Sequence, residues 1–120
     1  MTMGHAEAQP ALIRGIRSEA LGREAREACF LALGSIGTQA TVGALTPFLK
    51  DEDLEIAQWS ASALGRVGHR DAAEPLLDAM RRGDPALRDM CAWALQQISG
   101  KKLGQDPEVW KKWVFGEEGR

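Results

Sequence analysis

The stretch EACFLALGSIG at residues 27–37 returns in altered form as QWSASALGRVG at residues 58–68 and as DMCAWALQQIS at residues 89–99. The offset between successive copies is 31 residues. Counted from Ala25, Ile56 and Leu87, two residues before each copy, mostly apolar residues fall at i, i+3, i+4, i+7, i+8 and i+11, which is the spacing of one face of an α-helix. A short unit that recurs at a fixed interval predicts a repeat protein, in which neighbouring units supply one another's core.

A second helical segment follows each of the first two copies at the same offset. Leu45 aligns with Leu76 and Leu49 aligns with Met80, again along one helical stripe. We call the first helix of a unit its A helix and the second its B helix. Pro47 lies inside the first B helix, where it removes one backbone hydrogen bond, so we expect a kink there. Each unit is therefore predicted to be an antiparallel helix pair.

Residues that favour helix ends mark the boundaries of these helices. Asp53 and Asp84 precede A helices, and Asp is a strong N-cap because its carboxylate accepts hydrogen bonds from the free N–H groups of the first turn. Glycine readily takes the left-handed backbone conformation that ends many helices. We expect four glycines at the turns between A and B helices, namely Gly34, Gly37, Gly65 and Gly68.

The repeat breaks after residue 99. Asp106 and the proline that follows it predict a new helix start, and a short helix near residues 107–115 would place Trp110 and Trp113 on one face. A terminal helix of this kind hides the last open apolar face of a solenoid. We expect Trp93 to contact this lid, because no further repeat follows it.

These motifs resemble those of a known family. The ALG-x-[IV]-G sequences at residues 32–37 and 63–68, the EPLLDAM stretch at residues 74–80, and the DED and GDP connectors are similar to HEAT repeats of the short bacterial type, also called phycobilisome-lyase HEAT-like repeats. The resemblance covers residues 7–99. It implies an α-α superhelix and, as the usual role, a scaffold that binds proteins. Minority members of the family handle bilins, remove damaged DNA bases, or hydroxylate a modified lysine with iron.

The chain is therefore expected to be all-α, a right-handed solenoid of antiparallel helix pairs with about three repeats and a C-terminal capping helix. We expect a single domain over residues 1–120. Its parts are an orphan B helix at 7–18, a first repeat at 20–50, a second repeat at 54–82, the first helix of the last repeat at 85–99, and a loop with the capping helix at 100–120.

Charge and hydropathy limit the partners. Fifteen basic and seventeen acidic residues give a net charge of −2, whereas proteins that grip phosphates usually carry a basic excess, so nucleic acid is not the expected partner. No apolar stretch approaches the roughly 18–20 residues that a membrane helix needs, and the N-terminus lacks the pattern of a signal peptide. We expect a cytoplasmic protein without a membrane partner, while its oligomeric state stays open.

No residue set has the spacing of a catalytic or metal site, so we expect no enzyme activity, no catalytic or metal-binding residues and no cofactor. The two histidines, His5 and His69, have no nearby pair of carboxylates, and the His-Glu dipeptides of the iron-dependent relatives are missing. Cys29 and Cys91 occupy equivalent positions of two repeats that are two intervals apart. At roughly 8–10 Å per helix they lie about 20 Å from each other, too far for a disulfide, so we interpret them as buried small side chains.

The resemblance implies that B helices line the concave face, so we look for binding residues there. Charged side chains that project from the predicted B helices would form a mixed-charge strip, and two tryptophans would join it if they face solvent instead of packing as a lid. The candidates are Arg14, Arg17, Lys50, Glu74, Asp78, Arg81, Trp110 and Trp113. The leading hypothesis is a non-enzymatic scaffold that binds a peptide or protein segment along this face. The alternatives are a bilin-handling or nucleic-acid-binding subunit, and a spacer within a larger protein.

Overall fold

The computed structural model describes residues 5–116, and the side chains from residue 8 onward. This part of the chain contains helices and no strand, so the prediction of an all-α fold is confirmed. The side chain of His5 and residues 117–120, the end of the range expected to hold the capping helix, lie outside the described part. The elements are α1 His5–Arg17, α2 Arg23–Ile36, α3 Gln39–Leu45, η1 Thr46–Lys50, α4 Leu54–Val67, η2 Arg70–Ala72, α5 Ala73–Met80, α6 Pro85–Ser99 and α7 Pro107–Val114, where η denotes a 3₁₀-helix.

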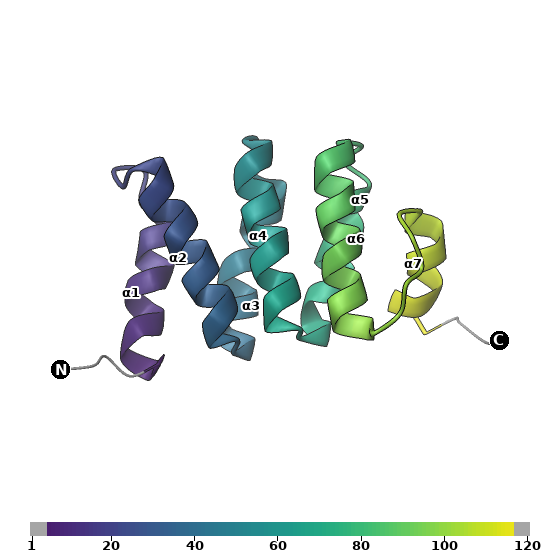
Figure 1. Ribbon diagram of the computed structural model, residues 1–120, viewed down its shortest axis with the longest axis horizontal. Helices are drawn as coiled ribbons and strands as arrows, with labels where there is room; N and C mark the ends of the chain where they lie inside the picture. Colours follow the sequence, from purple (N-terminus) through teal and green to yellow (C-terminus); the bar gives the residue numbers. More distant parts are fainter. Residues whose placement is uncertain (1–4, 117–120) are drawn as a thin grey trace.

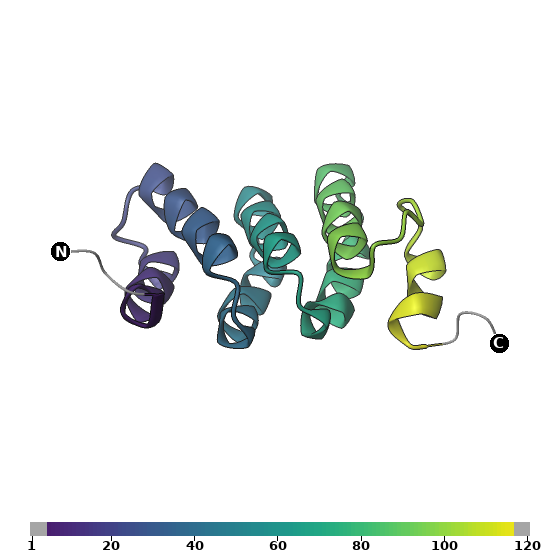
Figure 2. The same cartoon turned by 60° about the horizontal axis from the view of Figure 1, so that its bottom comes forward.

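The helices form two layers (Figures 1 and 2). In the A layer, α4 packs between α2 and α6, and the three helices lie side by side. The B layer holds α1, then α3 with η1, then η2 with α5, and finally α7. Here α1 packs on α2, η1 on α4, α5 on α6, and α7 on α5. The molecule is elongated along the stack, with extents of 52 × 27 × 17 Å, and the predicted solenoid of helix pairs is confirmed.

The repeated leucines of the A helices occupy equivalent places in the core. Leu33, Leu64 and Leu95 stand 31 residues apart, and all three are fully buried. Each therefore loses essentially all contact with water, which is worth about 1.5–3 kcal/mol per side chain. The same position of three successive repeats thus contributes to one core that runs through the A layer.

Two of the expected turn glycines serve a different purpose. Gly34 and Gly65 lie inside α2 and α4 and are buried where neighbouring A helices meet, so their placement in turns was wrong. A Cβ atom on Gly65 would lie 2.8 Å from the Cα of Ala94 and 2.6 Å from the ring of Trp93. A Cβ on Gly34 would lie 3.2 Å from the Cα of Ala63. Glycine is present because the helix backbones approach too closely for a side chain.

The same contact corrects the expectation for Trp93. Its ring lies against Gly65 of α4 and remains 38% exposed. The capping helix α7 instead packs on α5, in the B layer. Trp93 belongs to the A layer, and α7 takes the place along the stack that a B helix would occupy (Figure 2).

The predicted helix ends are confirmed at the remaining positions. Gly37 and Gly68 follow α2 and α4 with φ of 62° and 72°, in the left-handed region that glycine adopts without a Cβ penalty. Asp53, Asp84 and Asp106 cap α4, α6 and α7, because each side chain accepts a hydrogen bond from a backbone N–H of the first turn.

Pro47 changes the helix type of the first B helix. The α-helix α3 ends at Leu45, and the chain continues as the 3₁₀-helix η1 with Pro47 near its start. A proline cannot donate the hydrogen bond that would continue α3, so the predicted kink takes the form of a switch to a tighter helix. The carbonyl of Leu45 accepts a 2.6 Å hydrogen bond from the buried hydroxyl of Ser60 on α4. An A-helix side chain thus supports the junction.

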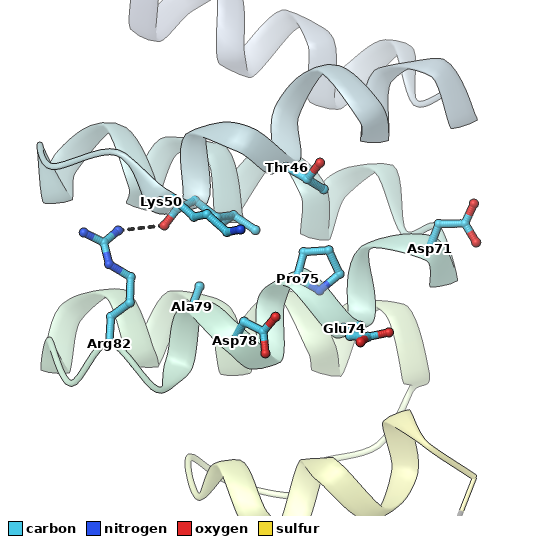
Figure 3. Close-up of a pocket in the computed structure, with 9 residues that line it drawn as sticks. Thr46, Lys50, Asp71, Glu74, Pro75, Asp78, Ala79 and Arg82 are labelled. Atoms are coloured by element: carbon cyan, nitrogen blue, oxygen red, sulfur yellow. Dashed lines mark hydrogen bonds between the residues drawn. The ribbon is translucent and has the colours of Figure 1, made fainter.

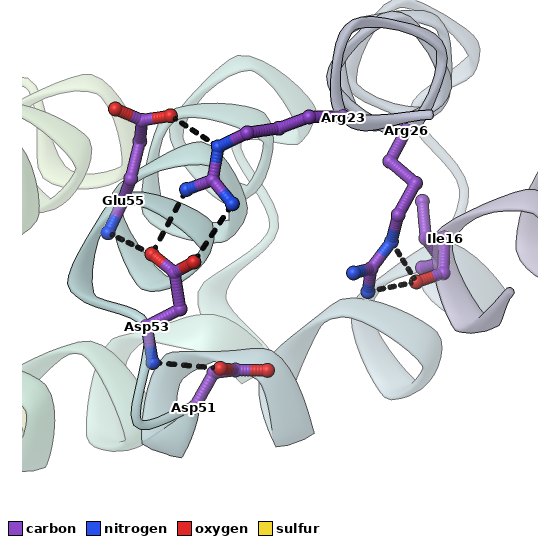
Figure 4. Close-up of polar contacts among 6 residues, drawn as sticks. All are labelled: Ile16, Arg23, Arg26, Asp51, Asp53 and Glu55. Carbon is purple, nitrogen blue, oxygen red and sulfur yellow. Dashed lines mark hydrogen bonds and ion pairs between the residues drawn. The ribbon is translucent and has the colours of Figure 1, made fainter. Parts of the chain in front are cut away.

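Arginines from other elements bind the C-terminal carbonyls of B-layer helices. Arg26 of α2 donates from Nε and Nη2 to the carbonyl of Ile16, near the end of α1, at 3.2 and 2.7 Å (Figure 4). Arg82, just after α5, donates to the carbonyls of Leu49 and Asp51 at the end of η1. These carbonyls have no partner within their own helix, and a cation near them also interacts favourably with the helix dipole.

An ion-pair cluster joins the starts of α2 and α4. Arg23 contacts Asp53 at 2.8 Å and Glu55 at 2.9 Å, as Figure 4 shows. The hydrogen bond from Arg23 holds the pKa of the Asp53 carboxyl below its usual value. Asp53 also caps α4, so one carboxylate fixes the helix start and ties it to the preceding A helix.

The close approach at Gly65 yields a prediction about stability. Gly65→Ala places a methyl group against the backbone of Ala94 and forces α4 and α6 apart, so we expect a loss of about 1–3 kcal/mol in the free energy of unfolding. Gly43→Ala in α3 is the matched control. A Cβ added at Gly43 would meet no atom within 4 Å, and replacing a helical glycine there gains about 0.5–1 kcal/mol. Urea denaturation measures both, and equal stability of the two variants would contradict the packing argument.

The cysteines yield a second prediction. Cys29 and Cys91 are both free thiols, and burial raises the pKa of Cys91 to about 12. Because the thiolate is the reactive form, Cys91 in a Cys29→Ser variant should react with Ellman's reagent at neutral pH only as fast as the protein opens. Absorbance of the released thionitrobenzoate measures this rate with and without denaturant. Rapid reaction in native buffer would mean that α6 does not bury its Cys91 face.

Candidate functional site

A groove of about 530 Å³ lies in the B layer between η1 and α5 (Figure 3). Thr46 and Lys50 come from the η1 side, and the facing wall comes from η2 and α5. The groove exists because two successive B helices pack on the A layer and leave a trough between them. The charged residues that line it are Lys50, Asp71, Glu74, Asp78 and Arg82.

Three carboxylates form one wall of the groove. Asp71, Glu74 and Asp78 are exposed and follow one another at intervals of three and four residues, which places them on a single face of η2 and α5. Asp71 accepts a 2.8 Å hydrogen bond from Gln39, on the preceding B helix. Asp78 lies 3.9 Å from the guanidinium of Arg81, a distance at which an exposed pair contributes little. We call these three residues the acidic wall.

Basic side chains lie at one end of the groove. Lys50 projects from the last residue of η1, and Arg82 lies across from it. The Arg82 guanidinium is already held by the carbonyls of Leu49 and Asp51, at 2.6 and 2.9 Å. Arg82 therefore fixes the spacing between η1 and α5. Lys50 is exposed at the same end of the groove.

The structure brings together only part of the predicted binding set. Lys50, Glu74 and Asp78 line the groove. Arg81 points to the far side of α5, where its guanidinium lies 3.5 Å from Glu108 of α7. The repeat explains this, because Lys50 and Arg81 are 31 residues apart and each faces the B-layer element that follows its own.

The two basic candidates of α1 also lie outside the groove. Arg14 and Arg17 are exposed in the last turn of α1. Neither contributes to the lining between η1 and α5, because α3 separates α1 from that trough along the B layer. The structure therefore does not assemble the single mixed-charge strip that the sequence predicted.

The C-terminal tryptophans pack as a lid. Trp110 is fully buried, and its indole Nε1 donates a 2.6 Å hydrogen bond to the carbonyl of Gly104, so its side chain is not on the surface of this structure. Trp113 packs edge to face against it, with ring centroids 6.0 Å apart. Arg70 stacks over Trp113 at 4.1 Å and donates to the carbonyls of Trp113 and Val114. These contacts fasten α7 to the start of the preceding B element.

The described residues contain no group of three or more His, Cys, Asp or Glu side chains that could hold a metal ion. His69 has a local role, because its Nδ1 accepts a 3.1 Å hydrogen bond from the backbone N–H of Asp71 and so caps η2. In the same part of the chain, no helix is long and apolar enough to cross a membrane.

Sequence reasoning missed Asp71 and Arg82. Asp71 follows a turn, and nothing in the helical pattern indicated that η2 would continue the face of α5. Arg82 directly follows Arg81, which was among the predicted binding residues. The helical pattern alone does not determine which of the two side chains points toward the preceding repeat. Arg82 donates to backbone carbonyls of Leu49 and Asp51, and such acceptors leave no mark in the side-chain pattern of the sequence.

Comparison with known proteins agrees with this architecture. No curated protein matches the chain. A family model of HEAT repeats matches residues 42–109, which run from the middle of α3 into α7 and make up more than half of the 120 residues. The match does not distinguish the short phycobilisome-lyase subtype from other HEAT repeats. With the two-layered stack of helix pairs, it establishes that the chain belongs to the HEAT-repeat family.

Proposed function

We propose that this chain is a non-enzymatic scaffold whose groove between η1 and α5 binds an extended peptide segment that carries basic residues. HEAT repeats are generally scaffolds for protein–protein interaction, which supports the first part of the proposal. The observation that carries the second part is the acidic wall of Asp71, Glu74 and Asp78 along one side of an open groove.

The charges of the groove favour a basic partner. Three carboxylates line it, whereas Arg82 is engaged with backbone carbonyls and Lys50 stands at one end. An arginine or lysine of the peptide beside Glu74 or Asp78 gains charge-assisted hydrogen bonds. An acidic or carboxyl-terminal group of the same peptide would face Lys50. The groove therefore favours one direction of the bound chain.

The shape of the groove favours a single strand of peptide. The trough is bounded by two short helices and floored by small and apolar side chains, among them Leu49, Pro75 and Ala79. Polar rims with a modest apolar floor are typical of surfaces that bind extended segments, with side chains supplying specificity. Because the charged rim is exposed to solvent, binding should be salt-dependent.

The proposal predicts the outcome of a peptide selection. Short displayed peptides selected on the whole protein should be enriched in Lys and Arg, and the double variant Glu74→Lys, Asp78→Lys should bind an enriched peptide about tenfold more weakly. This follows from two lost contacts of roughly 0.7 kcal/mol each, within the usual range for exposed charge pairs. Fluorescence anisotropy at low and high salt measures the affinity.

The matched control is the double variant Glu19→Lys, Glu52→Lys. It makes the same change in net charge at exposed residues that do not line the groove. The control should bind the peptide like the unmodified protein. If both double variants weaken binding equally, net charge and not the groove is responsible. A selection that enriches acidic or purely apolar peptides would overturn the proposal.

A further inference from the structure

A second surface lies on the outer face of the A layer, which Figure 1 shows in front of the B layer. Two hollows of about 180 and 440 Å³ occupy this face, one between α2 and α4 and the other between α4 and α6. Ser62 and Met90 line both hollows, so the two are continuous. We call the combined depression, which lies over the middle of α4, the A-layer trough.

The side chains at one repeat position give the trough its shape. Leu31, Ser62 and Trp93 stand 31 residues apart and therefore occupy equivalent places on α2, α4 and α6. Leu31 is 43% exposed and Trp93 is 38% exposed, whereas the residue between them is a small serine. The trough is therefore bounded by a large apolar side chain on each side and has a small residue at its centre.

The lining of the trough is largely apolar. Trp59 and Met90 are half-buried in it, and the ring of Phe30 lies 6.0 Å from that of Trp59. Together with Leu31 and Trp93 they form a contiguous patch that is drawn from three helices. Contiguous apolar patches rich in tryptophan and methionine mark interaction surfaces.

One cation is already part of this patch. The guanidinium of Arg23 lies over the ring of Trp59, 5.1 Å from its centroid. It also contacts Asp53 at 2.8 Å and Glu55 at 2.9 Å. These two carboxylates offset its charge, and its stacking on the indole holds the ring in place. Arg23 therefore shapes the trough but adds no free positive charge to it.

The free charges of the trough differ between its two ends. Glu27 of α2 and Asp89 of α6 line the hollows, each from the N-terminal half of its helix. Arg66 lines the second hollow from the last turn of α4. Within the part of the chain that the structure describes, these three side chains have no hydrogen bond or ion pair. Because the A helices run in the same direction, the trough has an acidic end and a basic end.

We propose that the A-layer trough binds one amphipathic helix of a partner protein, which lies along α4 and antiparallel to it. Neighbouring helices pack roughly 8–10 Å apart, so Leu31 and Trp93 start from backbones about 16–20 Å apart. An α-helix with its side chains is about 10–12 Å across. One helix therefore fits between the two apolar walls, above Ser62.

The two hollows favour a helix over an extended segment, because they lie on either side of α4. In a helix, apolar residues that are alternately three and four positions apart project to both sides of the line of contact, as in a coiled coil. Such residues enter the two hollows in turn. An extended strand presents the side chains of one face in a single row, so it fills one hollow and leaves the other empty.

The free charges set the direction of the bound helix. Lys and Arg are favourable near the C-terminus of a helix, and Asp and Glu near its N-terminus, because of the helix dipole. A partner helix with this charge order meets Glu27 and Asp89 with its basic end, and Arg66 with its acidic end, only when it runs antiparallel to α4. The trough therefore selects helices that have an acidic first turn and a basic last turn.

A displayed library of helical peptides about four turns long tests the proposal. The bait is the whole protein with the double variant Glu74→Lys, Asp78→Lys, so that the B-layer groove does not compete for basic peptides. Enriched peptides should carry apolar residues at i, i+3, i+4 and i+7, an acidic residue in the first turn and basic residues in the last turn. Enrichment of sequences without this helical spacing would overturn the proposal.

Two matched substitutions locate the binding site. Ser62→Phe places a ring where the helix should lie, so it should weaken the binding of an enriched peptide at least about tenfold in fluorescence anisotropy. Ser35→Phe makes the same change at an exposed residue of α2 that lines neither hollow, and it should leave the affinity unchanged. Circular dichroism verifies that both variants stay folded. Equal affinities of the two variants would contradict the proposed site.

A charge swap tests the direction of the bound helix. The triple variant Glu27→Lys, Asp89→Lys, Arg66→Glu exchanges the two ends of the trough. The unmodified protein should prefer an enriched peptide about fivefold over a copy whose first-turn and last-turn charges are exchanged, and the triple variant should show the opposite preference. The same preference in both proteins would rule out the proposed direction.

Sedimentation equilibrium excludes a different occupant. The unmodified protein should not dimerise through this face. A dimer that is lost in Ser62→Phe would mean that a second copy of the chain fills the trough, and it would overturn the proposal. Peptide binding in the B-layer groove does not depend on any of these outcomes.

Discussion

Close contact between A-helix backbones at Gly34 and Gly65 is the constraint on which the rest of the structure depends. It brings α2, α4 and α6 near enough for the repeated leucines to bury one another, and it sets the spacing that the B layer inherits. The equivalent residue of α6 is Gln96, which is half-buried. No further A helix packs beside α6 in the described part of the chain, so a long side chain is tolerated there.

The B layer is held together by different means. After α1, its helices have eight residues or fewer, and α3 and α5 each adjoin a 3₁₀-helix. The C-cap residues of η1, α5 and α7 are not the left-handed glycines that close the A helices. Carbonyls at the ends of B-layer helices are bound instead by Arg26, Arg82 and Arg70, each from another element. Every such arginine joins two neighbouring elements, so closing a helix end also fixes the distance between units. The groove between η1 and α5 keeps its width for this reason.

The sequence predicted the helix pairs, the 31-residue interval, the aspartate caps and the glycines at Gly37 and Gly68, because these follow from local backbone chemistry and periodicity. It could not tell a glycine needed for a left-handed turn from one needed for close approach, so Gly34 and Gly65 were misplaced. The site was harder to predict. Arg81 and Arg82 are adjacent, and only the packing of α7 decides that Arg81 meets Glu108 while Arg82 reaches back to η1.

The polarity of the groove has a consequence for the kind of partner that it suits. The groove between η1 and α5 is polar and open to solvent, so its charge pairs give a modest affinity by themselves. A partner that also touches a second surface of the same molecule binds far more tightly, because the second contact becomes intramolecular. The proposed groove is therefore better suited to supply one of several contacts of a scaffold than to hold a partner tightly alone.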